Sequence, residues 1–258
     1  CAGNSIPSDY SKSKLDLYKS TDHGKTWSFV SSIASGGRPK SENGYTPVWE
    51  PFPLVADNKL IVYYSDQRDP KYGQKIVHQT STDGINWGPV VDDVTSSLYI
   101  DRPGMPVVAQ MGNGNYIMTY EECGVKNCNV AYKIGPDPEN FGSATSVDLT
   151  TKDGLRPSSS PYVVWLPTGG PNGTLAVSAY GADRVLFLNT QNGEEGTWTV
   201  IKSNTEGGYS RGLVPMSDGH SLFVISGGPL GTDKTNSVTY GIVDLRGGNS
   251  DGIVTPTK

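Results

Sequence analysis

The stretch S-T-D-H-G-K-T-W occupies residues 20–27 and follows a β-rich run, and a shortened copy, S-T-D-G-I-N-W, occupies residues 81–87. In each copy the aspartate can accept hydrogen bonds from nearby backbone N–H groups and so fix a tight turn. The glycine tolerates unusual backbone angles, and the tryptophan buries a large apolar area. We therefore interpret both copies as devices that fold a β-hairpin, and not as catalytic groups.

The same unit recurs along the chain. A β-rich run and a turn lead to an aromatic residue at Trp27, Trp87, Phe141 and Trp198, at intervals of 60, 54 and 57 residues. Hairpins with Asn, Asp or Gly in their turns lie between these runs, at residues 53–64, 106–120, 161–180 and 215–225. Two hairpin strands, a third strand and the turn make one four-stranded antiparallel blade of a β-propeller.

The repeat therefore predicts an all-β fold, a β-propeller of four-stranded antiparallel blades with about 4.5 blades in 258 residues. A blade cannot bury both of its faces alone and must stack on a neighbour. We expect one β-propeller domain over residues 1–258. The alternative is a β-sandwich in which the spacing is accidental.

Composition excludes several classes of function. The net charge is −5, whereas nucleic-acid binding usually needs a basic surface, so we expect no nucleic-acid partner. No stretch approaches the ~18 apolar residues that span a membrane. There is no H-E-x-x-H motif and no cluster of Cys and His residues, so we expect no metal and no cofactor.

The cysteines bear on the compartment in which the protein works. Cys123 and Cys128 enclose only four residues, which favours a small disulfide ring in an oxidising compartment. The alternative is two unpaired thiols. With the disulfide, the protein is expected to be secreted and extracellular.

Candidate site residues lie at matched places before the hairpins. A propeller carries its site at one end of the central channel, where loops from several blades converge. Four segments precede the hairpins, at residues 47–52, 101–105, 155–159 and 209–213. The first carries Glu50, and the others carry Arg102, Arg156 and Arg211.

A second acidic pair, Glu121 and Glu122, ends the strand predicted at residues 116–120. Neighbours in a strand point to opposite faces, so only one of the two can face the site. Glu50 and one member of this pair could form the two-carboxylate arrangement of a glycosidase.

Several phrases resemble glycoside hydrolase family 93. They are V-W-E-P-F at residues 48–52, Y-Y-S-D-Q-R-D-P at 63–70, G-Q-K-I-V-H-Q at 73–79, D-R-P-G-M at 101–105 and T-Y-E at 119–121. That family contains fungal exo-arabinanases built as six-bladed propellers. The resemblance implies a retaining exo-enzyme that releases arabinobiose from linear 1,5-α-L-arabinan.

The resemblance also implies roles for individual residues. Glu50 would be the acid/base and Glu121 the nucleophile, or the two roles would be reversed, with Glu122 in place of Glu121 if the register is shifted by one. Tyr209 resembles a tyrosine near the family's site and is expected among the catalytic residues. The residues expected to bind substrate are Trp49, Asp69, Arg102, Arg156 and Arg211, with Trp49 and Tyr209 against sugar rings. A six-bladed member has more sequence before residue 20, so we expect this chain to be the C-terminal part of a longer propeller.

Two other functions remain open at the level of sequence. A sialidase shares the propeller and the S-x-D-x-G-x-T-W motif, and Arg102, Arg156 and Arg211 could imitate its arginine triad, which binds a sugar carboxylate. The F-R-I-P phrase typical of sialidases is not found. A non-catalytic propeller that binds carbohydrate or protein is the other alternative, since fold does not fix function. The expected partner is arabinan or an arabino-oligosaccharide, bound by a monomer.

Overall fold

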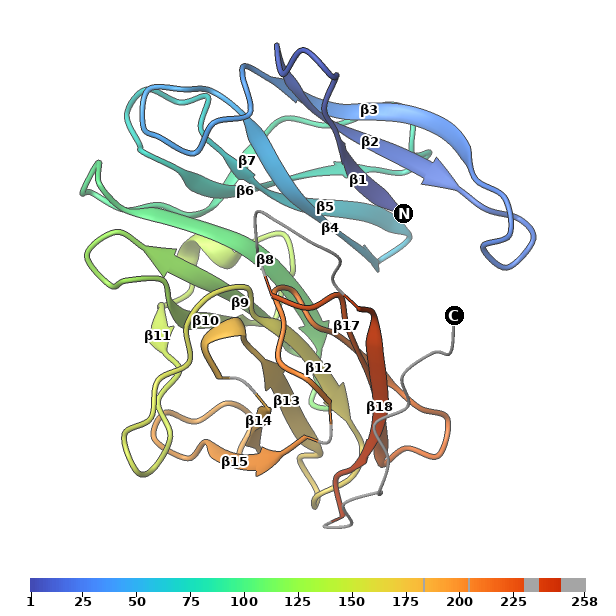
Figure 1. Cartoon of the computed structure of the whole chain (residues 1–258), viewed down its shortest axis with the longest axis vertical. Coiled ribbons are helices and arrows are strands. Elements are labelled where there is room, and N and C mark those ends of the chain that lie inside the picture. Colours follow the sequence, from blue (N-terminus) through green and yellow to red (C-terminus); the bar gives the residue numbers. More distant parts are fainter. Residues whose placement is uncertain (183, 204, 230–236, 247–258) are drawn as a thin grey trace. The chain divides into compact units, whose positions relative to one another are not determined.

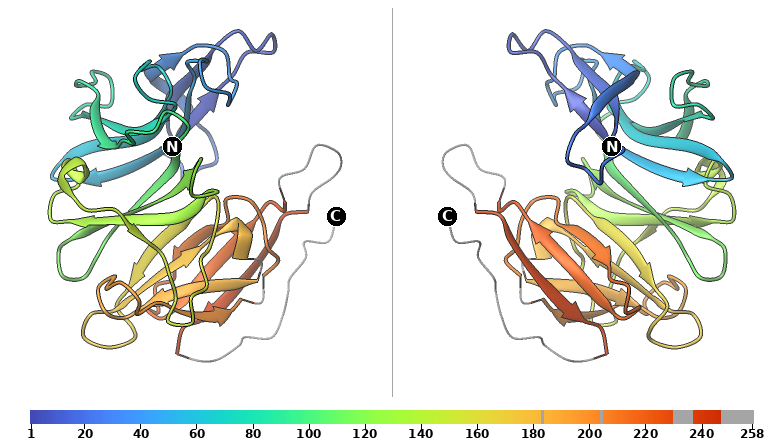
Figure 2. Two further views of the ribbon diagram at one scale, coloured as in Figure 1. Left: turned by 90° about the vertical axis from the view of Figure 1, so that its left-hand side faces the viewer. Right: turned by 90° about the vertical axis from the view of Figure 1, so that its right-hand side faces the viewer.

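The computed structural model describes residues 1–182, 184–203, 205–229 and 237–246, and these residues form antiparallel β-sheets (Figure 1). In each sheet the strands follow one another in sequence order, as Figure 2 shows from two further sides. Three of the five sheets have four strands, and the first and the last have three. The blade unit predicted from the sequence is therefore present, with incomplete units at both ends of the described chain.

The first sheet contains β1 (Ala2–Ser5), β2 (Ser13–Lys19) and β3 (Ser28–Gly36), and the second contains β4 (Val48–Ala56), β5 (Lys59–Asp66), β6 (Lys75–Ser81) and β7 (Val91–Val94). The third contains β8 (Arg102–Gln110), β9 (Tyr116–Cys123), β10 (Asn129–Gly135) and β11 (Val147–Asp148). The fourth contains β12 (Tyr162–Leu166), β13 (Thr174–Ser178), β14 (Val185–Asn189) and β15 (Thr199–Lys202). The fifth contains β16 (Gly212–Pro215), β17 (Ser221–Ser226) and β18 (Thr239–Asp244). Two short 3-10 helices, η1 (Phe141–Ser143) and η2 (Tyr180–Ala182), lie between strands.

The chain divides into two compact units, which we describe separately. One comprises Cys1–Pro106, Glu122–Lys126 and Pro138–Ser143, and the other comprises Val107–Glu121, Asn127–Asp137 and Ala144–Lys258. In the first unit, a core of Leu, Ile, Val, Ala and Tyr side chains lies between the first and second sheets and includes Leu15, Val48 and Tyr64. In the second unit, an aliphatic core joins the fourth and fifth sheets and includes Leu166, Leu186 and Leu222. Residues two positions apart on a strand, such as Val62 and Tyr64 or Leu186 and Leu188, contribute to the same core, because successive side chains point to opposite faces of a sheet.

In three of the four repeats, the recurring aromatic side chain contacts a strand of the sheet that precedes it in the chain. The indole N–H of Trp87 donates to Ser31 Oγ on β3 at 3.0 Å. Phe141 is fully buried and meets Tyr63 on β5 edge-on, and Trp198 is fully buried and meets Tyr132 on β10 in the same way. Trp27 differs, because 51% of it is exposed and its indole N–H donates to Gly24 O within its own turn.

The two S-x-D motifs form the turns expected from the sequence. Asp22 accepts hydrogen bonds from the N–H and the hydroxyl of Thr26 and from the hydroxyl of Ser20. Asp83 accepts in the same way from the N–H groups of Ile85 and Asn86 and from Ser81. These bonds favour the ionised carboxylate. The hydroxyl and the N–H of Thr26 lower the pKa of Asp22 to about 2.

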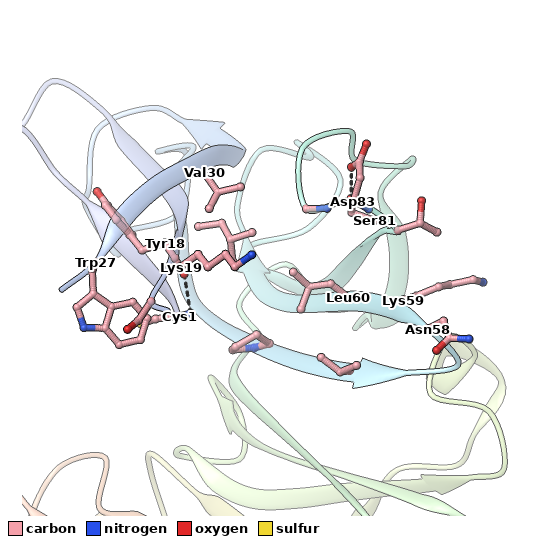
Figure 3. Close-up of a pocket in the computed structure, with 16 residues that line it drawn as sticks. Cys1, Tyr18, Lys19, Trp27, Val30, Asn58, Lys59, Leu60, Ser81 and Asp83 are labelled. Atoms are coloured by element: carbon pink, nitrogen blue, oxygen red, sulfur yellow. Dashed lines mark hydrogen bonds between the residues drawn. The ribbon is translucent and has the colours of Figure 1, made fainter. Parts of the chain in front are cut away.

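A groove of about 710 Å³ lies at the end of the sheets that carries these turns (Figure 3). Its lining includes Trp27, Asn58 in the β4–β5 turn, and Ser81 and Asp83 of the second motif. Strand β4 begins at Val48 and runs toward that turn, so Glu50 lies at the opposite end of β4. The groove is therefore separate from the candidate site residues of this unit.

Cys123 and Cys128 form a disulfide, whereas Cys1 is a free and exposed thiol. The disulfide closes the short connection between β9 and β10. Among the residues that the structure describes, no helix is both long and apolar enough to cross a bilayer.

The pKa of Asp22 leads to a prediction about stability. A carboxylate whose folded pKa lies below its unfolded value of 3.8 stabilises the fold above that value, and this contribution is lost as the pH falls through about 2. We expect Asp22→Ala to lower the thermal midpoint at pH 5–7, and the difference from the wild type to shrink toward pH 2. Thermal unfolding followed by circular dichroism over this pH range measures it. A difference that does not change with pH would contradict the hydrogen-bonding role of the carboxylate.

Candidate active site

Glu50 lies in a kink near the start of β4. The pairing with β5 shifts between Trp49 and Phe52, and Glu50 has φ +56°, in the left-handed region that non-glycine residues rarely adopt. Pro51 follows it and has no N–H to donate to the ladder. Such bulges interrupt the strand pairing and re-aim a side chain. The sequence W-E-P thus turns Glu50 out of the regular alternation of the strand.

Donors on β5 and β8 hold the Glu50 carboxylate. Its Oε2 accepts from the hydroxyl of Ser65 at 2.7 Å and from the N–H of Met105 at 2.9 Å. The N–H of Glu50 itself donates to Asn4 Oδ1 at 2.9 Å. Ser65 is fully buried on β5, directly opposite Trp49. The side chain of Glu50 therefore has a fixed orientation at this end of the second sheet.

The kink recurs before or within the first strand of the following sheets. Met105 has φ +55° and precedes Pro106, and Ser160 has φ +42° and precedes Pro161. Ser210, with φ +56°, comes just before β16. In each case the N–H of the kinked residue donates to a side-chain oxygen that comes earlier in the chain. For Ser160 the acceptor is Glu121 Oε2 at 2.9 Å, and for Ser210 it is Ser160 Oγ at 3.2 Å.

These contacts distinguish the two neighbouring glutamates of β9. Glu121 receives the kinked amide of Ser160, whereas Glu122 forms an ion pair with Lys126 in the β9–β10 turn at 3.0 Å. The sequence Y-E at residues 120–121 also matches Y-S at residues 64–65, where Ser65 accepts the amide of Met105 at 3.2 Å. The geometry therefore favours Glu121 over Glu122 as the site carboxylate. Glu50 and Glu121 belong to different compact units.

Arg102 and Trp49 meet at one glutamine. The guanidinium of Arg102 donates to Gln67 Oε1 at 3.1 Å and to Gln74 Oε1 at 2.8 Å. The indole N–H of Trp49 donates to the same Gln67 Oε1 at 2.8 Å. Gln67 and Gln74 are only 3% and 5% exposed, so buried side chains fix the positions of Arg102 and Trp49. Both expected substrate-binding residues are thereby oriented in the unit that carries Glu50.

Asp69 and Arg156 have partners of their own. Asp69 accepts from Lys75 Nζ at 2.9 Å, and this bond, with the N–H of Lys71, lowers the pKa of the Asp69 carboxyl. Arg156 is exposed and lies 3.4 Å from Asp148, an ion pair of small energetic value at a surface. Within each unit, no hydrogen bond among the described residues joins Asp69 to Glu50 or Arg156 to Glu121.

Tyr209 and Arg211 lie before β16, in the other unit. The ring of Tyr209 meets that of Tyr180 edge-on at 5.6 Å. Arg211 is only 1% exposed, and its guanidinium donates to Val185 O at 2.9 Å and to Ala179 O at 3.5 Å. The guanidinium also donates to Ser203 Oγ at 3.4 Å. That Arg211 holds a sugar hydroxyl stays a prediction, in a side chain whose described partners lie inside the unit.

Sequence reasoning missed four residues of this arrangement: Ser65, Gln67, Gln74 and Met105. All four lie inside the phrases that carry the family resemblance, at residues 63–70, 73–79 and 101–105. That clustering was the available signal. Their roles could not be inferred, because a buried serine or glutamine in a strand gives no indication of which side chain it contacts. The sulfurs of Cys123 and Cys128 are consumed by their disulfide, so they offer no thiolate to a metal.

Comparison with solved structures identifies the family. Neither a scan against protein-family models nor a search of curated proteins finds a match. The α-L-arabinanase of Penicillium chrysogenum, solved with arabinobiose, is 47% identical with a TM-score of 0.90, and the match covers 95% of this chain and 71% of that one. An α-L-arabinofuranosidase of Fusarium graminearum, solved with an iminosugar inhibitor, is 40% identical with a TM-score of 0.93, and the match covers 96% and 72%.

A third structure, the GH93 α-L-arabinofuranosidase of Fusarium graminearum with arabinobiose, is 39% identical with a TM-score of 0.91, over 95% of this chain and 71% of that one. Likeness at this level confirms the predicted fold class, an all-β propeller built from four-stranded antiparallel blades. An exo-β-1,3-galactanase of Phanerochaete chrysosporium, at 12% identity and a TM-score of 0.58, shares the fold alone. From the identity and coverage of the first three matches, the chain belongs to glycoside hydrolase family 93.

Proposed function

We propose that this protein is a retaining exo-acting α-L-arabinanase that releases arabinobiose from linear 1,5-α-L-arabinan outside the cell. The observation that carries the proposal is the 47% identity to an arabinanase solved with arabinobiose, in a chain whose Glu50 is oriented by Ser65 and Met105. A disulfide between Cys123 and Cys128 supports an oxidising, extracellular location.

In the proposed mechanism Glu50 is the acid/base and Glu121 the nucleophile. Glu50 would protonate the leaving glycosidic oxygen while Glu121 attacks the anomeric carbon, forming a covalent sugar–enzyme ester. Glu50, now ionised, would then take a proton from the water that hydrolyses this ester. The donors on Glu50 Oε2 favour the ionised carboxylate, which is the form that acts as the base in the second step, whereas the first step uses the protonated form.

The remaining residues would bind the sugar. Arg102 and Trp49, both held by Gln67, supply a cation and an aromatic face beside Glu50. Charged donors form the stronger hydrogen bonds to sugar hydroxyls, and aromatic rings pack against the apolar face of a sugar. Tyr209, packed on Tyr180, is the candidate ring in the other unit.

Substitution of the glutamates tests this assignment. Glu50→Gln and Glu121→Gln each keep the size of the side chain and remove its acid or nucleophile, so we expect at least about a 100-fold loss of kcat on linear arabinan. Reducing-sugar release measures the rate. Glu122→Gln is the matched control, because Glu122 pairs with Lys126, and it should stay within a few-fold of the wild type. Loss of activity in Glu122→Gln but not in Glu121→Gln would instead support the shifted register.

The same variants separate an enzyme from a propeller that only binds carbohydrate. A non-catalytic protein would show no turnover before substitution and would keep its affinity for arabino-oligosaccharides in Glu50→Gln. Calorimetric titration with arabinobiose alongside the rate assay distinguishes the two, because the enzyme loses its rate while retaining measurable binding.

Substrate choice tests the sialidase alternative. A sialidase needs three arginines around the sugar carboxylate, but Arg211 is buried on backbone carbonyls and Arg156 pairs with Asp148. We therefore expect hydrolysis of linear arabinan and none of a sialyl-lactose analogue under the same conditions. Release of sialic acid, detected chromatographically, would overturn the assignment as an arabinanase.

A further inference from the structure

Ser65 contacts both the Glu50 carboxylate and the backbone of Met105. Its hydroxyl donates to Glu50 Oε2 at 2.7 Å, and the same oxygen accepts the N–H of Met105 at 3.2 Å. A serine hydroxyl is one donor and two acceptors, so both contacts can be made at once. Ser65, Met105 and Glu50 Oε2 thus form a closed triangle of hydrogen bonds.

The surroundings leave this triangle little freedom. Ser65 is fully buried on β5, between Tyr64 and Asp66, which are also buried. Gly104 packs directly over it: a Cβ at that position would lie 3.1 Å from Ser65 Oγ, 3.3 Å from Glu50 Oε2 and 2.6 Å from Gln74 Nε2. The side chain of Gln74 is itself fixed by donating to Pro103 O at 2.9 Å. Movement of Glu50 Oε2 would therefore break its hydrogen bonds to Ser65 and Met105, and a side chain at position 104 would press on Ser65, Glu50 and Gln74.

On two other strands, a side chain at the position equivalent to Ser65 also accepts the N–H of a kinked residue. Asn4 on β1 accepts the kinked amide of Glu50, and Glu121 on β9 accepts the kinked amide of Ser160. On β5, Ser65 shares the kinked amide of Met105 with Glu50 Oε2, and its hydroxyl also donates to that carboxylate. A hydroxyl is needed for this second contact, whereas packing in a buried strand would be satisfied by alanine or valine.

We propose that Ser65 is a positioning residue for Glu50: its hydroxyl fixes Oε2 and stabilises the ionised carboxylate, and so sets the pH range in which Glu50 can work. The inference rests on the proposed function only in its last part, since the hydrogen bond and its effect on ionisation exist whether or not the chain hydrolyses arabinan.

The first experiment measures the ionisation of Glu50 directly. The 258-residue chain is labelled with ¹³C-glutamate, its carboxyl resonances are followed by NMR over pH, and the Glu50 signal is assigned by its absence in Glu50→Gln. A hydrogen bond to a charged group stabilises it enough to move a pKa by about one unit or more. We expect Ser65→Ala to raise the pKa of Glu50 by about this amount. An unchanged Glu50 titration in a folded Ser65→Ala protein would overturn the proposal.

Two further variants keep the test decisive. Ser65→Cys preserves the shape but donates a weaker hydrogen bond, and it should raise the Glu50 pKa by an intermediate amount; it also carries the test if Ser65→Ala does not fold. Ser31→Ala is the matched control. Ser31 is also a buried strand serine, but its hydroxyl donates to Gly84 O at the end of the sheet that carries the S-x-D turns. It should lower the thermal midpoint without shifting the Glu50 titration.

The second experiment is the pH profile of kcat/KM on arabinan. A higher Glu50 pKa moves the limb that Glu50 controls to higher pH: the basic limb if Glu50 is the acid/base, the acidic limb if it is the nucleophile. A merely structural serine would lower the rate evenly without moving either limb. If the wild type shows no hydrolysis but the NMR shift appears, the proposed function fails and the positioning role stands. If the wild type hydrolyses arabinan but Ser65→Ala shifts neither a limb of the pH profile nor the Glu50 titration, the proposed function stands and the positioning role fails.

Discussion

The candidate site depends on one backbone feature. A residue with positive φ kinks the chain, and its N–H donates a hydrogen bond to a side chain that comes earlier in the sequence. Residues with positive φ that are not glycine cost conformational energy and persist only where the surrounding structure determines them. Here the cost is offset by the hydrogen bonds that the kink makes possible, at Glu50, Met105, Ser160 and Ser210. The proline after three of these residues needs no N–H partner, so the ladder can be interrupted there without leaving an unsatisfied donor.

This device both builds the fold and orients the chemistry. At Asn4 and at Ser160 Oγ the acceptor is a neutral side chain, and the kinked amide only ties one strand to another. At Glu50 and Glu121 the acceptor is a carboxylate, and the same amide fixes a charged group. The same hydrogen bond therefore holds a carboxylate wherever glutamate replaces the neutral acceptor, as at Glu50 and Glu121.

Stability and function are separated along the strands. The S-x-D turns, their aromatic residues and the groove of Figure 3 lie at one end, where Ser81 pairs across from Leu60. Glu50, Ser65 and Gln67 lie at the other end, where Trp49 pairs with Ser65. Because β4 and β5 are nine and eight residues long and pair with each other at both ends, the end that carries the candidate site residues can hold kinks and charges while the turn end keeps the sheet together.

The sequence by itself determined the repeat, the strand content and the acidic residue in W-E-P, because period-two alternation, turn residues and spaced aromatics are local patterns that a chain carries in its order. It also placed Trp49, Arg102 and Glu121 among the candidates. Only the tertiary structure gave Glu121 the amide of Ser160 and Glu122 the ammonium of Lys126, buried Arg211, and brought Ser65, Gln67 and Gln74 against the candidate residues Glu50, Trp49 and Arg102. Those outcomes depend on which side chains meet across strands, and a hydrogen bond between residues 15 to 55 positions apart leaves no periodic trace in the sequence.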